Sequence, residues 1–183
     1  MLIHTPRLRL MTMELAHLAA FVRDPLSLGE LLEVAIPEQW PAYPAAYPHA
    51  LDLLRKDPLR SYSGWWLYLF VDPAHKVLVG CGGFKDAPDQ NGVVEIGCEI
   101  APASRGRGFA TEATRGLINY ACTRPEVRAI DAYSQAQPGG QSAFVAAVGM
   151  IRIGDTLESN ANIAWHWRIT SEAFVDARRA GLE

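Results

Sequence analysis

The chain has 183 residues, of which 49% are hydrophobic and 20% charged, so it is long and apolar enough for one globular domain over residues 1–183. Its formal net charge of −3 excludes a strongly basic protein, and we expect no nucleic-acid partner. No apolar run approaches the ~20 residues of a membrane helix, and the opening residues do not resemble a signal peptide. The three cysteines are widely spaced and form no zinc pattern with the five histidines. We therefore expect a cytoplasmic protein with no metal and no membrane partner.

The first half of the chain predicts short elements. Alternating residues predict a strand over 7–10, and apolar spacing predicts helices over 12–22 and 27–34. Prolines and aromatic residues then interrupt regular structure over 36–48, and a helix resumes near His49. No segment of this half repeats another, so we expect no repeat architecture.

The second half of the chain is rich in predicted strands. Three strands follow one another with turn residues between them, which predicts an antiparallel meander. The predicted strands are 65–71, 76–84, 92–100, 127–134, 150–157 and 163–170, and the predicted helices are 109–123 and 141–148. The fold class is therefore α+β, with a mixed, mostly antiparallel sheet of about seven strands flanked by helices.

A loop rich in Gly and Arg separates the third meander strand from the helix over 109–123. Residues 105–111 read Arg-Gly-Arg-Gly-Phe-Ala-Thr. Glycines let backbone N–H groups approach a ligand closely, and a helix N-terminus adds unpaired donors and a partial positive charge. The stretch lacks the Gly-Lys-Ser/Thr ending of a Walker A loop and the third glycine of a Rossmann fingerprint. These residues therefore predict a phosphate or pyrophosphate site of another kind, and a glycine-rich turn with solvated arginines is the alternative.

The loop matches the R/Q-x-x-G-x-G/A signature of the GNAT superfamily of acyl-CoA-dependent N-acetyltransferases, and the chain around it resembles the RimJ/RimL-type branch. The resemblance spans about residues 5–154 and rests on Thr5–Leu10, Val79–Phe84, Glu95–Gly97, Ala101-Pro102 and Ala110–Ala113. It implies the GNAT fold and acetyl-CoA as the donor. It also implies a pyrophosphate on the backbone of Arg105, Gly106, Arg107, Gly108, Phe109 and Ala110, with Thr111 adjacent, and a pantetheine arm along Cys98, Ile100 and Ala101.

The resemblance also implies direct attack of a primary amine on the thioester. Glu95 stands where many members carry a catalytic Glu, so we expect it to act as the base or through a water, although a purely structural carboxylate is the alternative. Alternation puts Glu95, Gly97 and Glu99 on one face of their strand. For Glu99 we expect solvation, with binding of a cationic substrate as the alternative. Cys98 is expected to be a small core residue rather than a nucleophile.

The late part of the family pattern is altered in this chain. Where members often carry an Asn, a Ser or Ala and a general-acid Tyr, this chain has Pro138, Gln141 and Val145, and Ser142 stands one residue out of register. The proton donor for the departing thiolate is therefore Ser142, Tyr133 or water. This departure leaves open a non-catalytic acyl-CoA-binding or sensing module. A phosphate-binding interaction domain without CoA is a third interpretation.

The acceptor is not specified by these motifs. In this family the segment between the first two strands shapes the acceptor cleft, so Trp40 and Tyr43 are expected to bind an apolar or aromatic amine, or else to form a homodimer contact. Trp165 and Trp167 alternate with His166 on a strand, and we interpret all three as structural. We expect an N-acetyltransferase acting on a protein or peptide N-terminus, an amino acid or a small-molecule amine.

Overall fold

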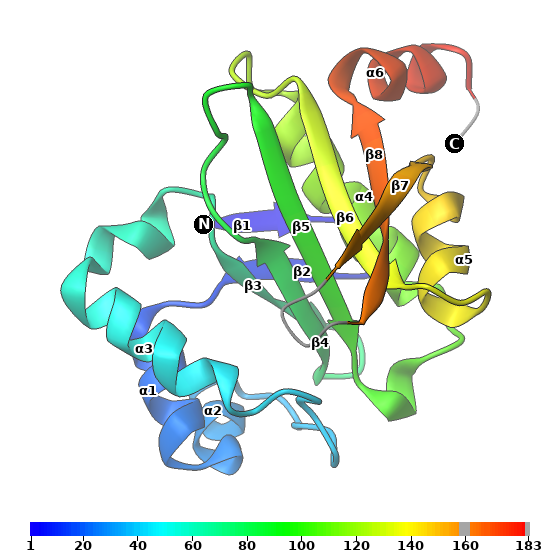
Figure 1. Ribbon diagram of the computed structural model, residues 1–183. Coiled ribbons are helices and arrows are strands. Elements are labelled where there is room, and N and C mark those ends of the chain that lie inside the picture. The colour runs from blue at the N-terminus through cyan, green and yellow to red at the C-terminus, as the bar shows by residue number, and fades with distance from the viewer. Residues whose placement is uncertain (158–161, 182–183) are drawn as a thin grey trace.

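One sheet organises the protein, whose computed structural model describes residues 1–157 and 162–181 (Figure 1). Within those ranges the sheet has eight strands in the order β1-β2-β3-β4-β5-β6-β8-β7. The strands are β1 (Leu2–His4), β2 (Arg9–Thr12), β3 (Leu67–Asp72), β4 (Val77–Phe84), β5 (Val93–Ile100), β6 (Ala129–Gln135), β7 (Ile151–Leu157) and β8 (Ile163–Thr170). The prediction of about seven strands missed β1, because three largely exposed residues carry no alternation of their own and are held by pairing with β2.

Six helices and two short 3-10 turns flank this sheet in the described ranges. They are α1 (Leu15–Arg23), α2 (Pro25–Leu32), α3 (Ala46–Lys56), η1 (Pro58–Tyr62), η2 (Pro102–Ser104), α4 (Phe109–Cys122), α5 (Gly140–Ala147) and α6 (Ser171–Arg179). The first helix begins later than predicted, because Thr12 is the last residue of β2 and its hydroxyl accepts from the Met1 amine. The second begins earlier, because the Asp24 side chain accepts from Leu26 N and caps it.

The helices divide into two groups that pack on opposite faces of the sheet (Figure 1). One core lies under α4, α5 and α6 and includes Phe109, Leu117, Val145 and Phe174. A second core lies under α1, α2 and α3 and includes Leu18 together with strand residues of β3 and β4. The predicted α+β class with flanking helices is confirmed.

The predicted meander is confirmed, since β3, β4 and β5 pair antiparallel in sequence order. Next to it, β5 and β6 pair in parallel over three positions only, from Val93–Ala129 to Glu95–Asp131. Both strands continue beyond this point without pairing to each other, so they diverge (Figure 1). We call the gap between residues 96–100 of β5 and 132–135 of β6 the splay.

Candidate active site

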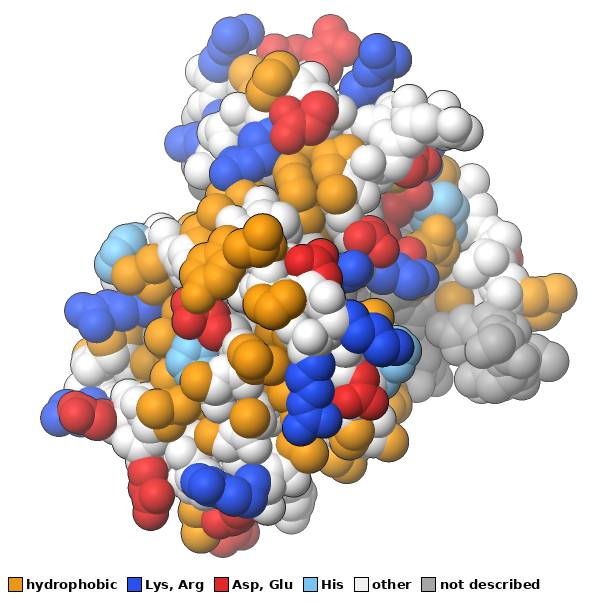
Figure 2. Space-filling view, turned by 90° about the vertical axis from the view of Figure 1, so that its left-hand side faces the viewer, with side chains coloured by type: hydrophobic (Ala, Val, Ile, Leu, Met, Phe, Trp, Pro, Cys, Tyr) orange, Lys and Arg blue, Asp and Glu red, His pale blue; other side chains and the backbone are white. Residues whose placement is uncertain are grey.

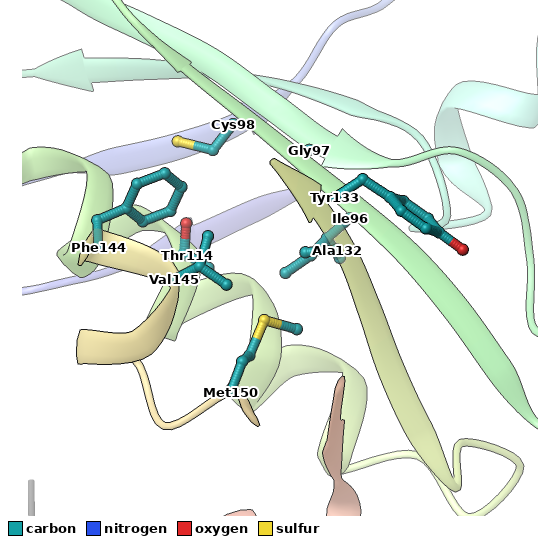
Figure 3. Close-up of a pocket in the computed structure, with 9 residues that line it drawn as sticks. All are labelled: Ile96, Gly97, Cys98, Thr114, Ala132, Tyr133, Phe144, Val145 and Met150. Carbon is teal, nitrogen blue, oxygen red and sulfur yellow. The ribbon is translucent and has the colours of Figure 1, made fainter. Parts of the chain in front are cut away.

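A cavity of about 50 Å³ lies in the splay, on the side of the sheet that α4 and α5 cover (Figure 3). Its lining is mainly apolar and includes Cys98 from β5, Thr114 from α4, and Phe144 and Val145 from α5. The Thr114 hydroxyl points toward Cys98 across this space (Figure 3). An apolar slot with a few polar groups suits an extended acyl chain better than a charged ligand.

Backbone groups of β5 face the splay. Lys85 N donates to Glu95 O at 3.0 Å and Ala101 N donates to Val79 O at 2.9 Å, so odd-numbered residues of β5 direct their backbone groups at β4. Because these groups alternate along a strand, Ile96 and Cys98 direct theirs at the splay. The Glu95–Asp131 pairing already uses the Ile96 N–H, so the Cys98 N–H is the donor for an extended ligand or for an oxyanion that develops there. Ala101, predicted to contact the donor, is fully buried and its N–H is already used.

The loop of residues 105–108 brings backbone N–H groups together at the start of α4. Gly106 and Gly108 have φ of +72° and +78°, a conformation that favours glycine, and no described atom lies within 4 Å of the position of a Cβ on Gly106. The first backbone bond of the helix runs from Glu112 N to Gly108 O. The amides of Phe109, Ala110 and Thr111 therefore have no acceptor inside the helix and can bind an anion.

The arginines of this loop have different roles. Arg105 Nε donates to Ile100 O at 3.0 Å, so its side chain ties the loop to the end of β5. Arg107 lies over the Phe109 ring at 4.8 Å, and Arg7 lies over the same ring at 4.7 Å. The Arg107 guanidinium therefore lies beside the open amides, and its positive charge favours a negatively charged ligand.

Sequence reasoning missed the group that holds this loop in place. Arg7 Nη1 donates to Arg107 O at 3.0 Å, and Glu112 in the first turn of α4 accepts from Thr5 Oγ1 and from Arg7 N and Nε. Arg7 and Glu112 belong to stretches already quoted for the family resemblance, Thr5–Leu10 and Ala110–Ala113. That resemblance was the signal in the sequence, but it did not indicate that the two residues pair, because they lie far apart along the chain.

Glu95 lies on the opposite face of the sheet from the cavity. Its position on β5 is in register with Asp131 of β6, at the last paired position before the splay. Its carboxylate accepts from Lys85 Nζ at 3.2 Å, and the exposed fractions of the two side chains are 37% and 73%. Glu95 is therefore a solvent-accessible carboxylate at the inner end of the splay, able to accept a proton from a ligand on this face.

The predicted acceptor residues are not brought together. Trp40 is only 5% exposed and packs against Phe21 and Tyr47 in the second core, so its predicted place on an open wall is wrong. Tyr43, by contrast, is 70% exposed. Glu99 is half-buried, and its Oε1 accepts from Ala42 N at 2.6 Å, so besides the expected solvation it anchors the segment between α2 and α3 to β5.

Ser142 lies in the first turn of α5, where its hydroxyl accepts from Gly139 N at 3.1 Å and is within hydrogen-bond distance of the Gln137 and Gly139 carbonyls. Its single proton is therefore engaged with the backbone. Tyr133 of β6 directs its ring away from the cavity (Figure 3) and stacks on His166. His166 does point away from the two flanking tryptophans, as predicted, and it bonds Asp131.

Among the described residues, no group of three or more His, Cys, Asp and Glu side chains is gathered as a metal-ligand set. None of the helices in the described ranges is long and apolar enough to cross a membrane. On the face shown in Figure 2, positive and negative side chains are interspersed with hydrophobic ones rather than gathered in one basic surface.

Comparison with known proteins identifies the family. The model of the acetyltransferase (GNAT) domain matches residues 7–151. An uncharacterized N-acetyltransferase of Bacillus subtilis, YjdG, is 31% identical over 153 residues, which cover 82% of this chain and 89% of that protein. A structure of RimL, the ribosomal L7/L12 alpha-N-protein acetyltransferase, in complex with coenzyme A aligns with a TM-score of 0.71 at 15% identity, covering 94% of this chain and 99% of that one. Mutant forms of the spermidine/spermine N-acetyltransferase SpeG from Vibrio cholerae align with a TM-score of 0.69 at 16% identity, covering 94% and 98%. The chain belongs to the GNAT family and is an acetyltransferase.

Proposed function

We propose that this protein is a RimJ/RimL-like N-acetyltransferase that transfers an acetyl group from acetyl-CoA to a primary amine. The acceptor is a protein or peptide N-terminus, an amino acid or a small molecule. The observation that carries this proposal is the splay, which has an apolar cavity on the α4 and α5 side and the Glu95 carboxylate on the other. Acyl donor and amine can therefore meet from opposite faces of one sheet.

The loop at the start of α4 fits the pyrophosphate of the donor. Gly106 and Gly108 leave room where a side chain would stand, and the amides of Phe109, Ala110 and Thr111 offer donors. The Arg107 guanidinium supplies positive charge beside them. The apolar cavity would take the thioester end of the pantetheine arm, with the Cys98 N–H as the donor to the carbonyl oxygen of the thioester. When bound, the thioester supplies an activated acetyl carbon.

The amine must lose a proton before its nitrogen can form the amide bond. We propose that Glu95 accepts this proton, directly or through a water. The nitrogen then bonds to the acetyl carbon as the carbon–sulfur bond breaks, and its second proton balances the charge on the departing sulfur. Because the Ser142 proton is engaged with backbone carbonyls, we propose that a water relays this second proton from the nitrogen to the sulfur.

The test is release of free thiol from acetyl-CoA across a panel of small amines, amino acids and N-terminal peptides. We expect amine-dependent release, and we expect Glu95→Gln to lower the rate by about 10²–10⁴-fold with the KM for acetyl-CoA unchanged. Ser142→Ala is the matched variant and should keep most of the activity. Unchanged release in Glu95→Gln would remove Glu95 from the mechanism. Thermal stabilisation by acetyl-CoA without release for any amine would favour the sensing module instead.

Two further observations support the setting of this activity. The three cysteines are free thiols, which supports a reducing cytoplasm. The names of RimL and SpeG state a ribosomal-protein N-terminus and spermidine or spermine as acceptors of those enzymes. Both acceptor types carry primary amines, and for this reason both belong in the panel.

A further inference from the structure

The face of the splay opposite the cavity has open space at its centre. Gly97 lies on the same face of β5 as Glu95 and Glu99, and no described heavy atom lies within 4 Å of the place where a Cβ on Gly97 would stand. A ligand that approaches over Gly97 would have the Glu95 carboxylate on one side and β6 across the gap.

Across that gap stands the ring of Tyr133, which is 40% exposed. One side of the ring is covered by His166, with 4.7 Å between ring centroids and 21° between planes. Because β6 lies between β8 and β5 in the sheet, the uncovered side of the ring is turned toward β5. Burial raises the pKa of the Tyr133 phenol, and the charges of Asp131, Glu95 and Lys85 also act on it.

Hydrogen bonds of His166 and Asp131 fix the ring on which Tyr133 stacks. His166 is the direct partner of Tyr133 in the β6–β8 register, and its Nε2 lies 2.7 Å from Asp131 Oδ2. Asp131 is itself buried and accepts two bonds from Arg168, at 2.6 and 2.8 Å. His166 therefore has a fixed ring plane against which the Tyr133 ring rests.

An ammonium group already occupies part of this face. The Lys85 side chain places its Nζ 3.2 Å from Glu95 Oε2, and at 73% exposure it is held only weakly. The group is a protonated primary amine, the same group that an alkylamine acceptor presents. An incoming ammonium can therefore replace Lys85 beside Glu95 at little cost.

We propose that the acceptor is a positively charged aliphatic amine whose ammonium group binds between the Tyr133 ring and the Glu95 carboxylate, with His166 and Asp131 as positioning residues. The inference rests on the proposed acetyltransferase function and names its substrate class. An aromatic ring attracts a cation over its face, and an adjacent carboxylate strengthens that preference. An aromatic amine, which is neutral at pH 7, gains neither interaction. This replaces the aromatic wall that Trp40 was expected to form.

The first experiment uses two non-reactive molecules of the same shape, choline and 3,3-dimethylbutan-1-ol, as inhibitors of acetyl transfer to the best amine of the panel. We expect choline to compete with the amine and to have a Ki about three- to thirtyfold lower than the neutral alcohol, the range of a cation–π contact. Equal inhibition by the two molecules, or none by choline, would overturn the proposal.

The second experiment separates Tyr133 and His166 by variants. Tyr133→Leu should raise the KM for the amine by the same about three- to thirtyfold and leave the KM for acetyl-CoA unchanged, while Tyr133→Phe should stay close to wild type. His166→Gln keeps a donor for Asp131 but loses the ring, so the KM for the amine should rise, and His166→Phe, which restores a ring without the bond to Asp131, should lower it only part of the way back. Tyr62→Leu, at an exposed tyrosine of η1, is the control. An unchanged KM for the amine in Tyr133→Leu or in His166→Gln would contradict the proposal.

A different result is expected if the proposed function itself is wrong. In that case no amine is acetylated, and titration of the CoA-saturated protein with choline does not shift the NMR signals of the Tyr133 and His166 rings. If amines are acetylated but the variants and the two inhibitors do not discriminate, only the substrate class is wrong.

Discussion

Glu112 accepts hydrogen bonds from both the backbone N–H and the Nε of Arg7, at 2.7 and 2.6 Å, although the two residues are 105 positions apart. Arg7 also donates to Arg107 O. The turn between β1 and β2 is thereby tied to the loop that we assign to the pyrophosphate. The pairing also neutralises an acidic side chain in the first turn of α4, where its charge would otherwise oppose an anionic ligand.

This pairing predicts a pH-dependent stability. Burial by itself would raise the pKa of Glu112, but the bonds from Thr5 and Arg7 outweigh it and the pKa is lowered from 4.5. A lowered folded-state pKa stabilises the fold above the unfolded value, and that stabilisation is lost as pH falls through the folded value. We expect Glu112→Gln to lower the free energy of unfolding at pH 7 by about 1 kcal/mol, since Arg7 is half exposed. The difference from wild type should shrink in urea titrations below pH 4.5.

Asp52→Asn is the matched control for this prediction, because Asp52 forms an exposed pair with Arg55. It should leave the free energy of unfolding unchanged across the same pH series. A constant difference between Glu112→Gln and wild type from pH 7 to pH 3 would show that the charge of Glu112 does not contribute.

The loop glycines predict a loss of donor binding on substitution. Gly108 has φ of +78°, and a Cβ there would lie 3.4 Å from Arg7 Nη2. Asp tolerates such a φ better than most residues, so Gly108→Asp should fold, but its carboxylate would stand among the free amides of α4. We expect CoA binding, measured by calorimetry, to be lost. Gly154→Asp adds the same charge on β7, where no described atom is within 4 Å of a Cβ, and should bind CoA normally. Normal binding in Gly108→Asp would show that the loop assignment is wrong.

Cys98 lines the cavity, and its thiol is expected to take no covalent part in the transfer. Burial raises the pKa of Cys98 to about 12, so its side chain is a neutral thiol at pH 7. We expect Cys98→Ser to keep activity within about twofold, since a buried thiol acts as a small apolar residue. In the absence of amine, the wild-type protein should release no stoichiometric burst of CoA from acetyl-CoA. Such a burst, absent in Cys98→Ser, would indicate an acetyl-cysteine intermediate and contradict direct transfer.

The hydrogen bond of Glu99 predicts that Glu99 variants change the KM for the amine. Its bond to Ala42 N fixes the segment that carries the exposed Tyr43. Glu99→Ala should raise the KM for the amine and leave that for acetyl-CoA unchanged, and Glu99→Gln, which keeps an accepting oxygen, should restore it. If Glu99→Gln is as impaired as Glu99→Ala, the charge of Glu99 contacts the substrate directly, which was the alternative weighed from the sequence.

Local patterns predicted much of this protein. The three meander strands and α4 lie close to their expected ranges, because each depends on alternation, helical spacing or turn residues within a few positions. The loop of residues 105–111 was recognisable for the same reason, since its glycines and the following helix start form one continuous segment. Local patterns were therefore sufficient to predict the fold class, the family and an anion site in this loop.

Contacts between distant segments determine which side chains share the face that we assign to the acceptor. Trp40 looked like a surface residue in a proline-rich passage, and its burial comes from helices α1 and α3. His166 looked structural, and its contacts with Tyr133 and Asp131 follow from the register of β6 against β8. Pairing between distant segments depends on sheet order, and sheet order is a property of the whole packed chain. The residues that we assign to the donor are local in sequence, whereas those that we assign to the amine are brought together by strands that pair across more than 30 positions.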